Sequence, residues 1–341
     1  MDNRIVFAVA GAGKTSLIID NLKEDSRALI ITYTVNNTEN LKLRVLKKFG
    51  FYPRGIQIYT YYQFLYRFCC RPVLGHKVNS KGIIWTMPPQ RIPKNKPEHY
   101  MTRNGYLYGN RIAKLLCEAK GGVAEVRARI EKYFDHLLID EVQDFAGNDF
   151  NFLTQLAETR VNQLLVGDYF QHTFDTSRDG MINRNLHIDF EKYRGRFEQA
   201  GYVVDTDLLS HSYRCSPTVC DFVTEALGIE ISSHRNDQTY IGFTDCPYQA
   251  KEIYSRADTI KLFYQSSDKY VGLTRNWGAT KGEDCYQDVC VVLNAKTWKL
   301  FHQAQLHALP AQTKNKLYVA CTRAKGDIHF IPETKLIDMR S

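Results

Sequence analysis

The chain has 341 residues, of which 44% are hydrophobic and 24% are charged, and its formal net charge is +8. This composition is typical of a soluble globular protein large enough for two domains. No apolar run approaches the roughly 18 residues of a membrane span, and no charged-then-apolar leader opens the chain, so we expect a cytoplasmic protein. The nine cysteines include no C-x-x-C pair, which argues against a disulfide framework or a zinc site. The positive charge favours a polyanionic partner.

The first residues predict a phosphate-binding loop. A short apolar strand over residues 5–8 leads into a turn at residues 9–12, after which Gly13, Lys14 and Thr15 open an apolar helix. Small residues let backbone N–H groups wrap phosphate oxygens, the lysine reaches the β- and γ-phosphates, and the hydroxyl binds Mg²⁺. The residues expected to hold the nucleotide are consecutive: Ala10, Gly11, Ala12, Gly13, Lys14, Thr15 and Ser16. Kinases, switches, transporters and motors all use such a loop, so the rest of the chain must decide the function.

A basic and irregular stretch follows between residues 67 and 103. It holds eight Lys/Arg residues against one acid, Glu98, and half of the ten prolines of the chain. Phe68, Trp85 and Tyr100 lie in the same stretch. Exposed aromatics among cations are the means by which proteins hold single-stranded nucleic acid. The alternative interpretation is a solvated loop without a ligand.

Short apolar runs separated by helical segments indicate parallel strands that are covered on both faces. After the first strand, these runs are 28–32, 57–59, 137–140, 163–167, 240–243, 259–263, 270–274, 289–293 and 328–331. The predicted class is α/β with two sheets. We expect a first domain over residues 1–206, with an insertion at about 66–128, and a second domain over residues 207–341.

Two acidic residues stand at the end of the predicted strand at 137–140. Open α/β sheets bind ligands at the carboxyl ends of their strands. Asp140 is therefore expected to hold Mg²⁺, and Glu141 to take a proton from the attacking water. An exposed acidic loop is the alternative. After the next strand, Gln171 follows Asp168 by three residues and is placed to sense the γ-phosphate.

Two arginines in the second half of the chain complete the predicted site. Arg214 and Arg323 lie far along the chain from the loop, and a planar cation can stabilise charge on phosphate oxygens. If both reach the nucleotide, the nucleotide binds between two domains. Hydrolysis would then open and close a cleft, as it does in a motor.

Taken in order, eight segments resemble the motifs of UvrD/Rep-type superfamily 1 helicases. They are AGAGKT at 10–15, TYTVNNTENLKLRV at 32–45, TYYQFL at 60–65, LLIDEVQDF at 137–145, LLVGDYFQHTF at 164–174, SYRCSP at 212–217, ATKGED at 279–284 and YVACTRAK at 318–325.

The resemblance implies two RecA-like domains with ATP and Mg²⁺ between them and a single DNA strand running across both. It implies that Tyr213 stacks on the base of ATP, that Arg214 and Arg323 act as arginine fingers, and that Gln171 couples the γ-phosphate to the DNA-facing surface. Gly282 and Glu283 are expected beside the nucleotide. The residues expected to contact the strand are Thr32, Tyr33, Asn37, Thr60, Tyr62, Phe174, Trp277 and Lys281. Without the resemblance, the tyrosines among them would be interpreted as core aromatics.

The sequence also departs from that family. Only seven residues precede Ala8, which leaves out the glutamine segment that reads adenine, and about 65 residues separate Arg214 from Lys281, where the family inserts a large domain. A chain that lacks these family segments fits a phage-encoded helicase, or a subunit of a Gabija-type defence system that works beside a nuclease.

Three functions remain open at this point. The first is an ATP-driven translocase or helicase on single-stranded DNA, moving 3′ to 5′, with RNA not excluded as a substrate and with a nuclease or a replication or repair protein as a further partner. The second is a nucleotide- and DNA-sensing subunit that gates a partner nuclease without sustained unwinding. The third is a small-molecule kinase, which has no need of arginines from a second domain.

Overall fold

The computed structural model describes residues 3–173, 177 and 179–340. The chain divides into two compact units. Unit 1 takes Lys14–Gly167, together with the described residues before Ala8 and those between Thr173 and Thr206. Unit 2 takes Ala8–Gly13, Asp168–Thr173 and the described residues from Thr206 onward. In the part of the chain that is described, every helix is too short or too polar to cross a bilayer.

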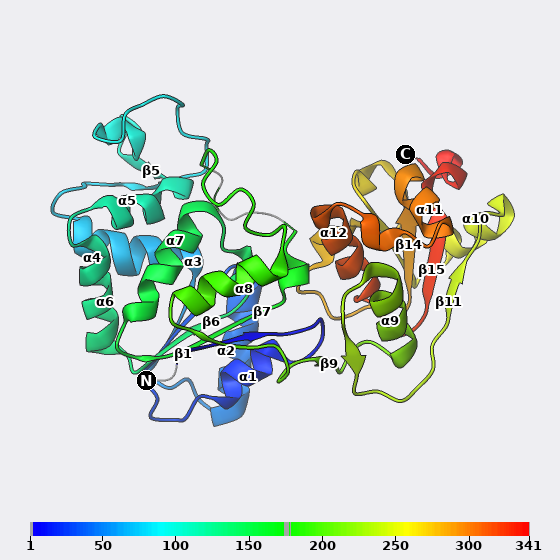
Figure 1. The fold of residues 1–341 in the computed structure, drawn as a ribbon, viewed down its shortest axis with the longest axis horizontal. Helices are drawn as coiled ribbons and strands as arrows, with labels where there is room; N and C mark the ends of the chain where they lie inside the picture. The colour runs from blue at the N-terminus through cyan, green and yellow to red at the C-terminus, as the bar shows by residue number, and fades with distance from the viewer. Residues whose placement is uncertain (1–2, 174–176, 178, 341) are drawn as a thin grey trace. The chain divides into compact units, whose positions relative to one another are not determined.

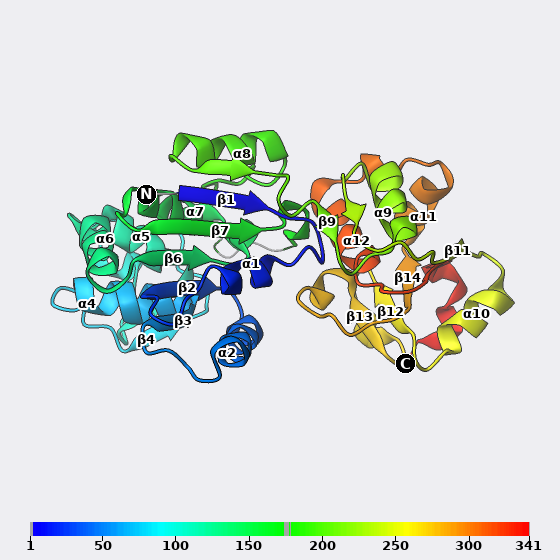
Figure 2. The ribbon, with the colours of Figure 1, turned by 90° about the horizontal axis from the view of Figure 1, so that it is seen from below.

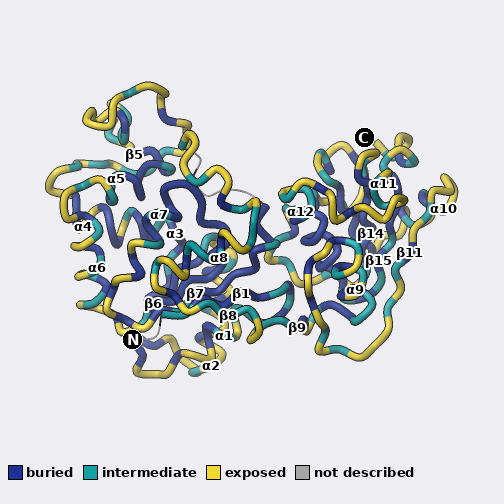
Figure 3. The backbone as a smooth tube through the Cα atoms, viewed as in Figure 1, coloured by how far each residue is buried: buried dark blue, intermediate teal, exposed yellow. Residues whose placement is uncertain are grey.

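Unit 1 is built on a six-stranded parallel sheet in the order β3-β2-β6-β7-β1-β8 (Figure 1). The strands are β1 (Asn3–Phe7), β2 (Ala28–Thr32), β3 (Ile56–Thr60), β6 (His136–Ile139), β7 (Asn162–Gly167) and β8 (Val203–Asp205). All five residues of β2 are buried, as expected for a strand covered on both faces. Figure 3 shows the central strands of this sheet as buried.

Helices cover both faces of this sheet because the chain first steps from β1 to β2 and β3, and later steps in the opposite direction from β6 to β7 and β8. The helices α1 (Lys14–Asp20) and α2 (Val35–Phe49) connect strands that step from β1 toward β3, whereas α7 (Gly147–Gln155) and α8 (Phe190–Gln199) connect strands that step from β6 toward β8. Right-handed crossovers that step in opposite directions place their helices on opposite faces. Figures 1 and 2 show α1 and α2 on one face of the sheet and α7 on the other.

The segment between β3 and β6 forms a helical layer with a small projecting part. It contains α3 (Tyr61–Gln63), a π-helical turn (Phe64–Cys70), α4 (Arg71–Leu74), β4 (Gly82–Ile84), β5 (Tyr106–Tyr108), α5 (Ile112–Glu118) and α6 (Gly122–Tyr133). The strands β4 and β5 pair in parallel with each other. Of the aromatics expected at this surface, Trp85 is 66% exposed, but Phe68 is buried in the core and Tyr100 is half-buried. Phe68 is buried because its ring stacks on that of Phe64, 5.6 Å away.

Unit 2 contains a five-stranded parallel sheet in the order β11-β15-β14-β12-β13. Its strands are β11 (Ile241–Phe243), β12 (Ile260–Phe263), β13 (Thr274–Asn276), β14 (Val289–Leu293) and β15 (Ile328–Pro332), and a separate parallel pair joins β9 (His211–Ser212) to β10 (Ser232–Ser233). Its helices are α9 (Pro217–Phe222), α10 (Pro247–Ser255), α11 (Ala295–His302) and α12 (Ala311–Cys321).

The central strand β14 contributes to two cores at once. Val289, Val291 and Leu293 pack into the cluster that contains residues of α9 and α12, whereas Cys290 and Val292 pack into the cluster that contains residues of α10. Successive side chains of a strand point to opposite faces of the sheet, so a strand buried on both faces reads as a continuous apolar run. This explains why the sequence VCVVL predicted the strand.

Among the described residues, five short strands have no counterpart in the sequence prediction, namely β4, β5, β8, β9 and β10, and one predicted strand is misplaced. The run at 270–274 was expected to be a strand, but β13 begins only at Thr274. Tyr270 is buried while Val271 and Leu273 are 61% and 44% exposed, so the run does not form a strand covered on both faces. The strands β4, β5 and β8 have three residues each, too few to show a periodic pattern.

Candidate functional site

The phosphate-binding loop has the backbone that its glycines predict. Gly11 and Gly13 have φ angles of 74° and 90°, in the left-handed region that favours glycine. A Cβ atom on Gly11 would lie 2.7 Å from Cβ of Arg214 and 2.8 Å from Oγ of Ser212, and the backbone N–H of Tyr213 donates to the Gly11 carbonyl at 3.0 Å. These residues all belong to unit 2. The loop therefore packs closely against the SYR segment, and this contact requires glycine.

Lys14, Thr15 and Ser16 form the first turn of α1 in unit 1. Lys14 and Thr15 are partly exposed, and Ser16 is exposed. Oγ of Ser16 accepts a hydrogen bond from the Arg44 guanidinium at 3.2 Å.

The hydroxyl of Tyr318 connects three of the predicted motifs within unit 2. It accepts a hydrogen bond from the backbone N–H of Ala10 at 2.8 Å and donates one to Oδ2 of Asp168 at 3.0 Å. The side-chain amide of Gln171 donates to the same Asp168 oxygen at 2.8 Å. Ala10, Asp168 and Tyr318 have no exposed surface, and burial raises the pKa of Tyr318 far above its usual value, so the hydroxyl keeps its proton. Tyr318 opens the motif YVACTRAK, but the motif alone does not show what its hydroxyl contacts.

Arg323 lies in the interior of unit 2, and carbonyl oxygens hold its guanidinium. The residue is 1% exposed, and its Nη1 donates to the Glu283 carbonyl at 2.8 Å and to the Thr280 carbonyl at 3.3 Å. Burial, and then the nearby charge of Arg214, lower the pKa of Arg323 to about 10, so it remains charged at neutral pH. Gly282, whose φ is 84°, shapes this carbonyl turn. Glu283 and Gly282 thus contact or position Arg323 through their backbone.

Arg214 is held by other groups of the same unit. Its Nε pairs with Asp284 at 2.8 Å, and its Nη1 donates to the Thr322 carbonyl at 3.2 Å. Burial alone would raise the pKa of Asp284, but Arg214 and Lys325 outweigh it and lower that pKa. The guanidinium groups of Arg214 and Arg323 therefore lie close together in unit 2, and Asp284 pairs with Arg214. This excess of positive charge favours the binding of a further anion.

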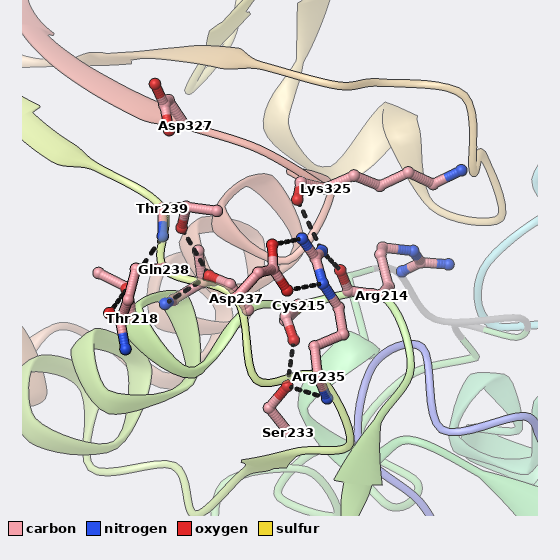
Figure 4. A network of polar contacts seen from close by, with 12 residues as sticks. Arg214, Cys215, Thr218, Ser233, Arg235, Asp237, Gln238, Thr239, Lys325 and Asp327 are labelled. Carbon is pink, nitrogen blue, oxygen red and sulfur yellow. Dashed lines mark hydrogen bonds and ion pairs between the residues drawn. The ribbon is translucent and has the colours of Figure 1, made fainter.

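Arg235 braces the segments that carry both arginines (Figure 4). Its Nη1 donates to the carbonyl of Arg214 and, at 2.6 Å, to the carbonyl of Lys325, while its guanidinium pairs with Asp237. Oγ of Ser233 donates to the Cys215 carbonyl at 2.7 Å. Arg235 belongs to none of the predicted motifs, so sequence reasoning could not have found its role.

The two predicted acids follow β6 in unit 1. Asp140 and Glu141 are 3% and 8% exposed. Glu141 has a φ of 57°, which costs a residue with a side chain about 1–2 kcal/mol, and its carboxylate accepts a hydrogen bond from Nε2 of Gln143 at 2.5 Å. A Cβ on Gly167, at the end of β7, would lie 2.5 Å from Oε1 of Gln143. Strain at a single acidic residue is a common property of functional sites.

Tyr213, the residue expected to stack on the base of ATP, presents its ring at the surface of unit 2. It is 65% exposed, and its ring stacks on that of His234 with centroids 4.1 Å apart and planes inclined by 18°. The imidazole supports the phenol ring and leaves most of Tyr213 accessible.

The structure separates the expected nucleic-acid contacts into two groups. Tyr33, Asn37, Tyr62 and Lys281 are partly exposed. Thr32, Thr60 and Trp277 are buried, and Phe174 lies outside the described residues.

For the buried group, the structure corrects the expectation of a nucleic-acid contact. Trp277 has no exposed surface, because its side chain fills the core beside β12. Its indole N–H donates to the Leu262 carbonyl at 2.8 Å. Thr32 is the fully buried last residue of β2. Thr60 caps α3, where its hydroxyl accepts from the Gln63 N–H at 3.3 Å.

Comparison with known proteins finds a match over the part of the chain that contains two of these motifs. Residues 95–176, which include Asp140, Glu141 and Gln171, match the model of the UvrD/REP helicase N-terminal domain. A comparison of the sequence with curated proteins finds no match.

Solved structures of helicases resemble the whole chain. Arterivirus nonstructural protein 10 (helicase), in a complex with DNA, matches with a TM-score of 0.52 and 14% identity over 96% of this chain and 60% of that one. The PRRSV helicase matches with a TM-score of 0.48 and 14% identity over 99% of this chain and 54% of that one. At such identity the arterivirus helicase shows the fold alone. This chain spans about 60% of that protein's length.

The fold is therefore an α/β fold that the arterivirus helicase also has. Within it, residues 95–176 are similar to the N-terminal domain of UvrD/REP helicases, as the order of the motifs predicted.

Proposed function

We propose that the chain is an ATP-dependent translocase or helicase that moves along single-stranded DNA from 3′ to 5′. The observation that carries the proposal is the Tyr318 hydroxyl, which joins the phosphate-binding loop to Asp168 and to the helix that leads to Arg323. Through these hydrogen bonds, a shift of the loop would move the segments that carry Asp168 and Tyr318. Such a connection is what a motor needs in order to convert hydrolysis into movement.

The residues present fit a nucleoside triphosphate with Mg²⁺. At Gly11 a Cβ would clash with Arg214, and Gly11 and Gly13 have the left-handed φ angles that a tight phosphate-binding turn requires. In the proposed complex Lys14 holds phosphate oxygens, Thr15 and Asp140 hold Mg²⁺, and Tyr213 stacks on the base. Bound ATP supplies the phosphoanhydride bond whose hydrolysis drives movement.

The chain's own residues then divide the work of hydrolysis. Glu141 accepts the proton of the attacking water, and Gln143 fixes the orientation of that carboxylate. Arg214 and Arg323 stabilise the negative charge that develops on the transferred phosphoryl oxygens. Gln171, hydrogen-bonded to Asp168, reports the state of the phosphate to Tyr318. Tyr33 and Tyr62 contribute surface for the strand.

Strand displacement tests this proposal most broadly. A duplex with a 3′ single-stranded tail is mixed with the protein and ATP, and release of the labelled strand is followed beside a duplex with a 5′ tail. We expect release from the 3′-tailed duplex only, and none with Lys14→Ala. An RNA-tailed duplex is run in parallel because no residue identified so far reads the 2′-hydroxyl. Release from neither duplex, without any effect of single strands on hydrolysis, contradicts the proposal.

A second function is favoured by how the two arginines are held. Arg214 is paired with Asp284, and carbonyl groups engage Arg323. An ATPase with its fingers held in this way hydrolyses slowly until a partner rearranges them. The corresponding alternative is a nucleotide- and DNA-sensing subunit that gates a nuclease or a replication or repair protein. Hydrolysis stimulated by DNA, with displacement only after a partner is added, would favour this alternative.

A further inference from the structure

Trp85 is a tryptophan exposed at the surface of unit 1. It follows β4, in the segment that projects from the helical layer, and it is 66% exposed. It belongs to none of the helicase motifs. A tryptophan left in solvent forgoes the large stabilisation that its burial would bring, so an exposed indole needs a reason.

Two contacts hold the indole in place. Its ring lies edge-to-face with that of Tyr62, with centroids 4.5 Å apart and planes inclined by 86°. On another side it lies against the backbone of Gly109, where a Cβ would approach the six-membered ring to within 2.8 Å. The absence of a side chain at Gly109 therefore lets the indole sit against the backbone. The contacts with Tyr62 and Gly109 thus fix the position of the indole ring at the surface.

Trp85 extends a row of aromatic rings that begins at the predicted nucleic-acid contacts. The rings of Tyr33 and Tyr62 are 6.2 Å apart, and Trp85 follows Tyr62. Tyr33 and Tyr62 come from the segments after β2 and β3, at the carboxyl edge of the sheet, whereas Trp85 comes from the projecting segment. Three separate segments of unit 1 thus bring aromatic rings together, with the indole as the most exposed of them.

The charge around Trp85 suits a polyanion. Residues 77–105 contain six Lys/Arg residues and one acid, Glu98. Lys94 pairs with Glu118 at 3.0 Å, and Lys81, Arg91, Lys96 and Arg103 are exposed. Aromatic rings that accept bases, surrounded by cations that accept phosphates, are the combination that binds single strands without reading their sequence.

We propose that Trp85, supported by Tyr62 and Gly109, is a stacking platform for an unpaired base of the bound strand. This inference rests on the proposed function and adds to it a specific residue outside the family motifs. The occupant is single-stranded nucleic acid, because in a duplex the base faces are already stacked on one another. Stacking of a base on Trp85 contributes binding free energy that does not depend on ionic strength, whereas the contacts of the surrounding cations with phosphates supply the salt-dependent part.

Binding of a fluorescent oligo(dT) to the full chain, measured by anisotropy over a series of salt concentrations, tests the proposal. We expect Trp85→Ala to weaken binding by about 5- to 100-fold without changing the slope of log K against log salt. Trp85→Phe should stay within a few-fold of wild type. Arg91→Ala should instead reduce the slope by about one. The matched control is Met87→Ala, since Met87 is 71% exposed two residues away, and it should bind like wild type.

A second measurement does not depend on affinity. The chain has three tryptophans, of which Trp277 is fully buried and Trp298 stacks on Phe301. Oligo(dT) should quench tryptophan emission of the wild type and leave that of Trp85→Phe unchanged.

Three binding results would overturn the inference without reference to hydrolysis. They are wild-type affinity in Trp85→Ala, an equal loss in Met87→Ala, and equal weakening by Trp85→Ala for a blunt duplex. DNA-stimulated hydrolysis that is identical in wild type and Trp85→Ala would leave the proposed function standing while removing the platform. A wild type that binds neither oligo(dT) nor oligo(rU) would remove both.

Discussion

Replacing Tyr318 with phenylalanine removes one oxygen atom and two buried hydrogen bonds. The backbone N–H of Ala10 loses its acceptor at a residue with no exposed surface, which costs about 1–3 kcal/mol. The bond to Asp168 is lost as well, but that carboxylate keeps the N–H of Phe170 at 3.1 Å and the amide of Gln171 at 2.8 Å. We therefore expect a total destabilisation of unit 2 of about 2–4 kcal/mol.

Thermal unfolding followed by calorimetry measures this effect. For a unit of roughly 150 residues, 1 kcal/mol corresponds to about 2–4 °C, so the transition of unit 2 should fall by roughly 5–15 °C. Tyr213→Phe is the matched control, because that ring is 65% exposed, and its transition should move by less than about 2 °C. If Tyr318→Phe unfolds at the wild-type temperature, the hydroxyl does not join the loop to Asp168 and the coupling argument fails.

Three further predictions follow from particular contacts. Gly11→Ala should destabilise unit 2 by more than about 2 kcal/mol and abolish nucleotide binding, since the new Cβ meets Arg214 at 2.7 Å; unchanged binding in a titration with a fluorescent ATP analogue would show that the loop is not the site. Arg235→Ala removes the hydrogen bonds to the carbonyls of Arg214 and Lys325 and should slow ATP hydrolysis by about tenfold or more in a steady-state assay. Arg256→Ala is the control, because Arg256 is exposed. Equal rates in Arg235→Ala and wild type would show that Arg235 does not position the two arginine segments. Burial lowers the pKa of His99 below 6.5, against an opposing hydrogen bond to the Ile92 carbonyl, so the folded state binds its proton less readily. The free energy of unfolding should then be constant above about pH 7 and fall as the pH drops below about 6.5. Urea midpoints measured from pH 5 to 8 should decline less in His99→Asn than in the wild type. Identical pH profiles of the two proteins would contradict the assignment.

The charged groups around His99 explain why its protonation matters. Nδ1 of His99 lies 2.7 Å from the Ile92 carbonyl, so this nitrogen carries the proton of the neutral ring. Nε2 then accepts from the Lys114 ammonium at 3.0 Å. Asp179 is shared by Lys114 and Arg111, at 3.3 and 3.0 Å. A second proton on His99 would face Lys114 directly.

Most strands and the phosphate-binding loop could be predicted from local sequence. The run VCVVL of β14 is apolar throughout because both faces of the strand are buried, and the glycines of the loop are needed for left-handed φ angles. Those properties depend on a residue and its immediate neighbours. The short strands β4, β5 and β8 lack such a pattern, and Trp277 and Thr32 matched their motifs although their side chains are buried.

The connections within the candidate site could not be predicted in the same way. Tyr318 acts through Ala10 and Asp168, which are far from it in the chain and meet it only in the folded unit. Arg235 is bound to carbonyl groups, which every residue possesses, so no sequence pattern marks its partners. The sequence shows Trp85 as an aromatic in a basic stretch, but its contact with Gly109 arises from the pairing of β4 with β5, and its contact with Tyr62 brings it to the segment after β3.

The rate of ATP hydrolysis with and without single-stranded DNA tests the central claim most directly. We predict that saturating oligo(dT) raises the rate of the wild type by at least about tenfold, and that Arg323→Ala, which leaves Lys14 and Glu141 in place, hydrolyses about 10³-fold more slowly than wild type even with DNA. Equal rates in the presence and absence of DNA, or a fully active Arg323→Ala, would contradict the account.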